Sequence, residues 1–258
     1  MEGFHRRPAL IAAMLILAGS LAGMLLVGYA TAHGPGVGGD ATIYLLSAEN
    51  LLAGNGLGWM EPGGFHRLDY YPPFFPLAVS VMSLFVGDVV AAARWLNMLL
   101  FGSLIALSGA WLYHATHRPL LAGMLSGMLA VSPVLIRVFS WAMAEALFLL
   151  TGFGGLALLA ADSRRPRVPV LLGAALLSGL AFLSRYLGIA FVISGTLLIL
   201  VSAPGASSFA VRLRRSMIYS AVALLPMAAW LITDFIASGT IGGRSSMPGY
   251  MFLPRLFG

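Results

Sequence analysis

Long uncharged apolar runs restrict this sequence more than any other feature. A helix needs about 20 apolar residues to cross a hydrocarbon core ~30 Å thick, and residues 8–39, 95–117 and 186–211 each reach that length without an Asp, Glu or Arg. Hydrophobic residues make up 59% of the chain and charged residues 9%, whereas a soluble domain has roughly 45–50% and 25%. We therefore predict an all-α, polytopic membrane protein.

The basic residues indicate orientation in a membrane and not binding to nucleic acid. All 15 of them are arginine, and the isoelectric point of the sequence is about 10.2. The arginines form short clusters between apolar segments, as the topology signals of membrane proteins do. We expect membrane lipids as partners and no nucleic acid. Cysteine is absent, which excludes disulfides and thiolate metal sites.

The first apolar run combines features of a signal peptide and of a membrane anchor. Arg6 and Arg7 precede it, and residues 30–32 (Ala-Thr-Ala) resemble a cleavage site. The run from Ala9 to Tyr29 spans 21 residues, but the apolar region of a signal peptide has only about 7–15. Its length therefore predicts an uncleaved first transmembrane helix.

Eight apolar segments are candidates for crossing the membrane. If all eight crossed from a cytoplasmic N-terminus, the arginine clusters at 164–167 and 212–215 would both face outward, against the positive-inside rule. If one early segment does not cross, both clusters return to the cytoplasmic side. The segments cover residues 9–30, 73–87, 95–113, 119–136, 140–161, 168–184, 186–203 and 216–236.

The segment at 73–87 is the one that we expect not to cross. From Phe74 to Gly87 it has 14 residues, about 21 Å of helix, which is shorter than the hydrocarbon core. Prolines also crowd its start, so an interfacial helix describes it better. Seven transmembrane helices result, with a cytoplasmic N-terminus, an outward tail after Asp234, and residues 31–88 as a large outer loop.

The outer loop should contain a second interfacial helix. Asp40 can N-cap a helix that runs to Ala53 and stops at the Gly-Asn-Gly sequence of residues 54–56. Apolar residues recur along this segment at helical spacing. We treat residues 1–258 as a single membrane-embedded module, and its outer loop carries the candidate active site.

Acidic residues concentrate in this loop, since five of the nine lie between Asp40 and Asp88. Asp40 is open to two interpretations, a structural helix cap or a catalytic group, and Tyr71 begins either a plain proline turn or a wall of the site. Glu145 lies inside the 140–161 span, where a carboxylate is costly and usually faces a cavity or a partner. A snorkelling or protonated glutamate is the alternative.

Four arginines lie at predicted outer ends of spans, where the positive-inside rule disfavours them. A lipid headgroup anchor explains each of them alone. Together they indicate an anionic partner such as a phosphate-bearing lipid, because the planar guanidinium suits phosphate. The four are Arg94, Arg137, Arg185 and Arg244.

Metal and cofactor signals are weak. His66 and Asp69 share the outer loop with Asp40, so a divalent metal can be imagined, but no ligand spacing supports one. We therefore assign no metal ligand and no certain cofactor. The sequence also contains no Walker, dinucleotide-binding, GxSxG or HExxH motif.

Several short motifs together resemble the GT-C glycosyltransferases, in particular the protein O-mannosyltransferase and aminoarabinose-transferase (family 39-like) branch. They follow the expected order over residues 1–250. The motifs are residues 39–44 (GDATIY), 48–56 (AENLLAGNG), 71–76 (YPPFFP), 93–97 (ARWLN), 144–148 (AEALF) and 183–188 (LSRYLG).

The resemblance implies an enzyme that takes a sugar from a polyprenyl-phosphate donor, built on a seven-span core with interfacial helices in its first loop. In this family's pattern Asp40 would be the general base, Glu145 would line the site and Arg94 would face the lipid phosphate. The predicted donor-binding set also includes Arg185, Arg244, Tyr71 and His66. Members of the family usually continue for several more spans, so we expect a truncated or partial chain.

From these features we predict an inverting glycosyltransferase of the cytoplasmic membrane, with its site facing the periplasm or exterior. Its acceptor would be lipid A or lipopolysaccharide, a cell-envelope glycan or a protein. One alternative is a non-enzymatic transporter or flippase for the same lipids. The other is an inactive membrane scaffold.

Overall fold

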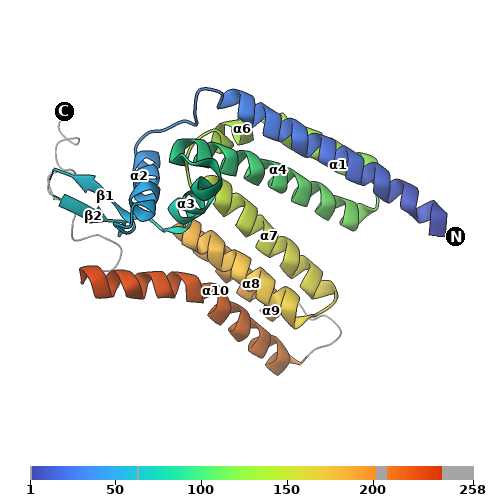
Figure 1. Ribbon diagram of the computed structural model, residues 1–258. Helices are drawn as coiled ribbons and strands as arrows, with labels where there is room; N and C mark the ends of the chain where they lie inside the picture. The colour runs from blue at the N-terminus through green and yellow to red at the C-terminus, as the bar shows by residue number, and fades with distance from the viewer. Residues whose placement is uncertain (1, 63, 202–207, 240–258) are drawn as a thin grey trace, which may run out of the picture.

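The computed structural model describes residues 2–62, 64–201 and 208–239, in which the chain forms ten α-helices, a short 3₁₀ helix and one two-stranded sheet (Figure 1). The predicted all-α class is confirmed, apart from a small β-hairpin that the sequence did not suggest. The helices that run between the two ends of the molecule are α1 (Glu2–Ala30), α4 (Val89–Thr116), α5 (Pro119–Ala130), α7 (Glu145–Arg164), α8 (Val168–Ser184), α9 (Ile189–Val201) and α10 (Phe209–Ser238).

These helices form two packed groups. Helices α1, α4 and α5 pack together in one group, α7 to α10 form the other, and a contact between α4 and α7 joins them (Figure 1). The backbones approach closely where α8 meets α10: a Cβ on Gly179 would lie 2.5 Å from the carbonyl oxygen of Ala223. Only glycine fits there, as is common where membrane helices pack.

The helices connect at two opposite ends. The site end carries the segment between α1 and α4, the start of α7 and the ends of α8 and α10 (Figure 1). The arginine end carries the α4–α5 and α7–α8 turns and the start of α10. Exposed aromatic side chains gather at the site end, as they do at a membrane–water interface: Tyr29, Trp95, Trp141 and Tyr186.

Four of the described helices are long and apolar enough to cross a membrane, namely α1 from Arg7 onward, α4, α7 and α10 to Ala237. Helices α5 and α6 (Pro133–Phe139) add a fifth crossing if the pair is one broken span, since their axes differ by 60°. Helices α8 and α9 are apolar but shorter. The molecule therefore has the helices of a membrane protein, four or five of them of spanning length.

Two predicted spans differ in shape from the prediction. Residues 119–136 do not form one helix, because Pro133 lacks an N–H and disfavours a helical residue before it; Ser132 is accordingly extended. Residues 140–161 become helical only at Glu145. The residues before Glu145 pair instead with the backbone of Gly36.

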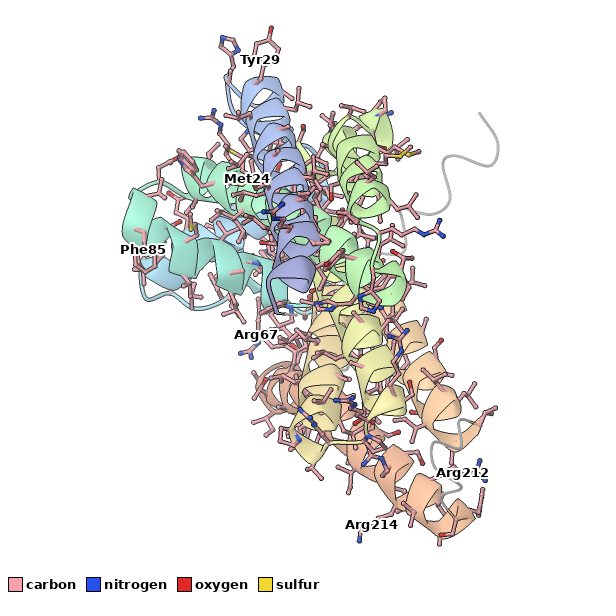
Figure 2. All side chains as sticks on the ribbon, turned by 90° about the vertical axis from the view of Figure 1, so that its right-hand side faces the viewer. Met24, Tyr29, Arg67, Phe85, Arg212 and Arg214 are labelled. Carbon is pink, nitrogen blue, oxygen red and sulfur yellow. The ribbon has the colours of Figure 1, made fainter. Side chains whose placement is uncertain are left out.

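The segment between α1 and α4 folds onto the start of α4. Tyr44, Ala48, Phe75 and Val79 are buried together in the cluster that joins this segment to α4. Phe85 is 81% exposed on the other side (Figure 2), where lipid would solvate an apolar side chain better than water. The elements of this segment are α2 (Asp40–Leu52), β1 (Gly58–Glu61), β2 (Gly64–Arg67) and α3 (Phe74–Val86).

The two predicted helices of the outer loop are present, and the hairpin between them is an addition. Strands β1 and β2 pair antiparallel, with Gly58 opposite Arg67 and Glu61 opposite Gly64. The strands have four residues each and are mostly exposed, so they lack the alternating pattern that predicts a half-buried strand. The Pro-Gly-Gly sequence of residues 62–64 was the available turn signal.

Because the two ends lie at opposite extremes of helices long enough to span, we expect cysteines placed at Glu61 and Arg165 to face opposite sides of a membrane. The chain has no native cysteine, so each single-cysteine variant reports on one position. In sealed vesicles, a membrane-impermeant maleimide should label one variant at once and the other only after permeabilisation. Labelling of both from the same side would contradict the arrangement.

Candidate active site

A cavity of about 600 Å³ opens at the site end. Its walls come from the start of α2, the turn after β2, the end of α8 with the residues that follow, and the C-terminal half of α10. Leu187 and Leu231 supply apolar surface. The polar lining consists of Asp40, Tyr44, Tyr70, Tyr71, Ser184, Arg185 and Tyr186.

Asp40 is the carboxylate of the cavity. It is the first residue of α2 and the N-cap position is Gly39, so the predicted N-cap role of Asp40 is wrong. Its Oδ1 instead accepts a 2.7 Å hydrogen bond from the Tyr71 hydroxyl. Asp40 is therefore inside the first turn of α2, and its side chain bonds to a tyrosine 31 residues away in the chain. The N-terminus of α2 still favours a negative charge at this position.

Tyr71 remains a hydrogen-bond donor over the physiological pH range. Burial raises the pKa of its hydroxyl, and the hydrogen bond to Asp40 raises the pKa further. A tyrosine that keeps its proton can stabilise an ionised carboxylate, because a hydrogen bond to a charged group is worth more than one between neutral groups. Tyr71 therefore fixes one oxygen of Asp40.

Tyr44 lines the cavity together with Asp40 and Arg185. Its ring packs edge-on against Tyr71 and Phe75, with centroids 5.4 and 5.5 Å away. Burial is the main cause of the raised pKa of Tyr44, and the negative charges of Asp40 and Glu145 raise it further while Arg185 lowers it. Asp40, Tyr44 and Arg185 line one cavity, and Glu145 is paired with Arg185 beside it.

Glu145 and Arg185 form an ion pair beside the cavity. Glu145 begins α7 and Arg185 directly follows α8, and these two helices pack against each other along their length. The side chains are 31% and 39% exposed. Arg185 lines the cavity itself, so Glu145 positions the guanidinium that the cavity presents.

The tight turn after α8 places Arg185. Its backbone is extended (φ −148°, ψ 139°), and the 3₁₀ helix η1 (Tyr186–Gly188) folds back onto the last turn of α8. A Cβ on Gly188 would lie 2.4 Å from backbone atoms of Ala181. The glycine that ends the 183–188 motif is therefore a backbone requirement of this turn.

A second set of contacts places Glu145. Asn97 is fully buried on α4 and donates to the carbonyl oxygen of Trp141 at 2.6 Å. Gly36 exchanges backbone hydrogen bonds with the same segment, at 2.8 Å to Ser140 and 3.0 Å to Ala142. The segment before α7 is thereby held in place. Sequence reasoning missed the role of Asn97, although an amide inside an apolar span was an available signal.

The hairpin is anchored to α10 by Arg67. Its Nε lies 3.6 Å from Asp234 Oδ1, its Nη2 donates to the carbonyl of Thr233 at 3.5 Å, and its guanidinium lies 5.9 Å from the centroid of Trp230. Arg67 ends β2, and the cavity-lining residues Tyr70 and Tyr71 follow three and four residues later. This contact therefore positions one wall of the cavity against another, and sequence reasoning did not identify it.

The remaining predicted donor-binding residues lie elsewhere. Arg94 donates to the Gly28 carbonyl at 3.0 Å and to Thr31 Oγ1 at 3.2 Å, so it binds the end of α1. His66 stacks on Trp59 within the hairpin, with ring centroids 5.9 Å apart. Neither belongs to the cavity lining, and Arg244 lies outside the described residues. Arg185 and Tyr71 are the members of the predicted set that the fold brings to the cavity.

No group of three or more His, Asp or Glu side chains in the described part of the chain could hold a metal ion. A requirement for a divalent cation stays a prediction. Comparison of the chain with family models, curated proteins and solved structures found no match.

We expect the Glu145–Arg185 pair to show coupled effects on stability. Each side chain is about a third exposed, so the pair lies between exposed pairs worth ~0.2–1 kcal/mol and buried pairs whose rupture costs ~3–5 kcal/mol. Glu145→Gln and Arg185→Gln should each lower the free energy of unfolding by about 1–3 kcal/mol. The double variant should lose less than the sum, as measured by denaturation of the purified proteins. Strictly additive losses would show that the two groups do not interact.

Proposed function

We propose that the chain is the membrane-embedded module of a GT-C-type glycosyltransferase that moves a sugar from a polyprenyl-phosphate donor to an acceptor outside the cytoplasm. The observation that carries this proposal is the meeting of Asp40 and Arg185 in one cavity. Each belongs to one of the motifs that resemble this family, and 144 residues separate them in the chain. A carboxylate facing a guanidinium suits transfer from a phosphate leaving group.

Asp40 would act as the general base. Tyr71 bonds to Oδ1, and we assign Oδ2 to the acceptor hydroxyl. As that hydroxyl attacks the anomeric carbon from the face opposite the phosphate, its proton passes to Oδ2, and the bond from the anomeric carbon to the phosphate oxygen breaks. A positioned base of this kind contributes typically 10²–10⁴-fold to the rate. Configuration at the anomeric carbon is inverted.

Arg185 would stabilise the departing lipid phosphate. One of its nitrogens, Nη1, donates to Glu145, and the guanidinium fork has further donors for a phosphate oxygen. Positive charge placed where negative charge develops lowers the barrier. The tyrosine rings that line the cavity offer apolar faces and hydroxyls to a sugar. Leu187 and Leu231 supply apolar surface beside the start of a prenyl chain.

The proposal includes a membrane orientation. Counting α8, α9 and the bent α5–α6 pair as crossings gives seven spans, with α2 and α3 as interfacial helices at the site end. The arginine end would face the cytoplasm under the positive-inside rule, together with the N-terminus. The cavity then opens toward the periplasm or exterior of the cytoplasmic membrane, where lipid-linked sugars replace nucleotide sugars as donors.

A non-enzymatic transporter of the same lipids is the second candidate. The break between α5 and α6 favours it, because broken helices are typical of transporters. The two functions differ in what they require of Asp40, since a transporter needs no proton acceptor. An inactive scaffold would need neither Asp40 nor Arg185.

Asp40→Asn should greatly slow transfer while the fold persists. Asparagine keeps a side-chain oxygen for the Tyr71 hydroxyl but cannot take up a proton, so we expect the transfer rate to fall about 100-fold or more. Membranes containing the variant are incubated with a panel of polyprenyl-phosphate sugars, and the products are identified by mass spectrometry. Glu49→Gln is the matched control, because Glu49 is an exposed carboxylate on the same helix, and it should transfer normally. Normal transfer by Asp40→Asn would return this residue to a structural role.

Lysine variants of Arg185 and Arg94 should distinguish an arginine that binds the donor from one that only contacts the end of α1. Arg185→Lys keeps the charge but loses the fork, and losing one charged hydrogen bond costs roughly 1.5–3 kcal/mol, so we expect kcat/KM for the donor to fall about tenfold or more. Arg94→Lys should leave kcat/KM for the donor unchanged and lower thermal stability, because Arg94 binds the end of α1. If Arg94→Lys impaired donor use and Arg185→Lys did not, Arg94 would be the phosphate ligand, as the resemblance implied.

A further inference from the structure

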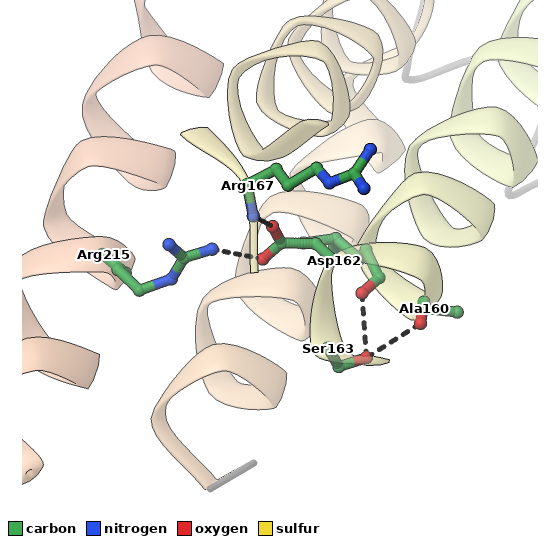
Figure 3. A network of polar contacts seen from close by, with 6 residues as sticks. Ala160, Asp162, Ser163, Arg167 and Arg215 are labelled. Atoms are coloured by element: carbon green, nitrogen blue, oxygen red, sulfur yellow. Dashed lines mark hydrogen bonds and ion pairs between the residues drawn. The ribbon is translucent and has the colours of Figure 1, made fainter. Parts of the chain in front are cut away.

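Asp162 forms a buried network of polar contacts at the arginine end of the molecule (Figure 3). Asp162, near the end of α7, has a side chain only 6% exposed. One of its oxygens pairs with the Arg215 guanidinium of α10, and the other accepts the backbone N–H of Arg167 at 2.9 Å. One carboxylate therefore fixes the end of α7, the start of α8 and the first turns of α10 relative to one another.

Arginines far outnumber acidic residues in the segments around Asp162. Residues 160–170 and 208–216 contain six arginines and one aspartate, a net charge of five positive. Arg215 is paired with Asp162, and Arg212 donates to the carbonyls of Leu200 and Val201 at the end of α9. Figure 3 shows the Arg167 side chain extending away from the Asp162 carboxylate. The exposed members of the cluster are Arg164, Arg165, Arg167 and Arg214.

The surroundings of the cluster are apolar. Val168, Phe209 and Met217 are exposed beside it, and Arg214 lies at the tip of the molecule with Arg212 (Figure 2). Exposed apolar side chains next to arginines at the ends of apolar helices are the pattern of a boundary between hydrocarbon and headgroups. An anion bound there would be attached to a lipid.

We propose that the ends of α7, α8 and α10 form a binding site for the phosphate of an anionic phospholipid, built by Asp162. The guanidinium fork matches a phosphate oxygen pair, and basic clusters next to membrane helices attract anionic headgroups. Asp162 lowers the net positive charge of the arginine cluster by one. Its contacts with the Arg167 N–H and the Arg215 guanidinium nevertheless hold the α7–α8 turn against the start of α10. The proposal is independent of glycosyl transfer and of the cavity at the site end.

The test is a titration of the purified full chain in detergent with phosphatidylglycerol, read by native mass spectrometry. Phosphatidylcholine and inorganic phosphate serve as neutral-lipid and headgroup-only probes. We expect phosphatidylglycerol to bind at least tenfold more tightly than either. An arginine next to a bound anionic headgroup contributes about fivefold, so the double variant Arg165→Gln, Arg214→Gln should weaken that binding by about tenfold or more. Arg118 is exposed at the same end but lies on the α4–α5 turn, outside the Asp162 cluster, so Arg118→Gln should change the binding less than twofold.

Asp162→Asn distinguishes a binding site that Asp162 organises from a basic surface that attracts lipid by its net charge alone. The substitution makes the cluster more positive by one charge, so an unstructured basic patch would bind phosphatidylglycerol equally or more tightly. A site that depends on Asp162 should bind it several-fold more weakly, and equal or tighter binding overturns the proposal. If Asp162→Asn does not fold, the arginine variants decide, and equal effects of the double variant and Arg118→Gln overturn it. Inorganic phosphate binding as tightly as phosphatidylglycerol would also overturn it.

Discussion

Hydrocarbon tolerates neither an unpaired backbone group nor an unpaired charge, and the architecture of this chain follows from that constraint. In the described long helices the charged side chains lie toward the helix ends, and the middles are apolar. Polar chemistry is consequently divided between two ends that are a helix length apart. One end carries the cavity with Asp40, Arg185 and several tyrosines, and the other end carries the arginines around Asp162.

Helix α7 links these two ends. It carries Glu145 as its first residue and Asp162 near its last turn, and each acid is paired with an arginine from another element. The site-end pair joins α7 to the end of α8, and the arginine-end pair joins α7 to the start of α10. Buried or half-buried pairs add little net stability against apolar alternatives, but removing one partner is costly. Two such pairs at opposite ends therefore favour one axial position of α7 among its neighbours.

The cavity depends on contacts that bring distant segments together at the site end. Arg67 ties the hairpin to α10, Tyr71 ties the following turn to α2, and Arg185 reaches the first residue of α7. Each contact joins residues separated by at least 31 positions in the chain. The cavity is thus a product of the outer segment docking on the helical bundle, and neither part would form it alone.

The all-α class, the positions of most helices, the two helices α2 and α3 of the outer segment and the candidate residues Asp40, Tyr71, Glu145 and Arg185 could all be predicted from the amino-acid sequence. These follow from local physics: apolar length, helical periodicity and the cost of a charge near lipid. The sequence did not predict the hairpin or the bend between α5 and α6 at Pro133. It also did not predict that Gly39, and not Asp40, occupies the N-cap position of α2.

Which arginine lines the cavity depends on how the helices pack and could not be predicted from the sequence. Arg94 and Arg185 look equivalent in sequence, since both lie where a span begins or ends, yet one binds the end of α1 and the other lines the cavity. The same is true of Asn97, whose amide is explained only by the carbonyl of Trp141, 44 residues away. Spacing along a helix says which face a side chain occupies, but the partner on that face is set by how the helices pack.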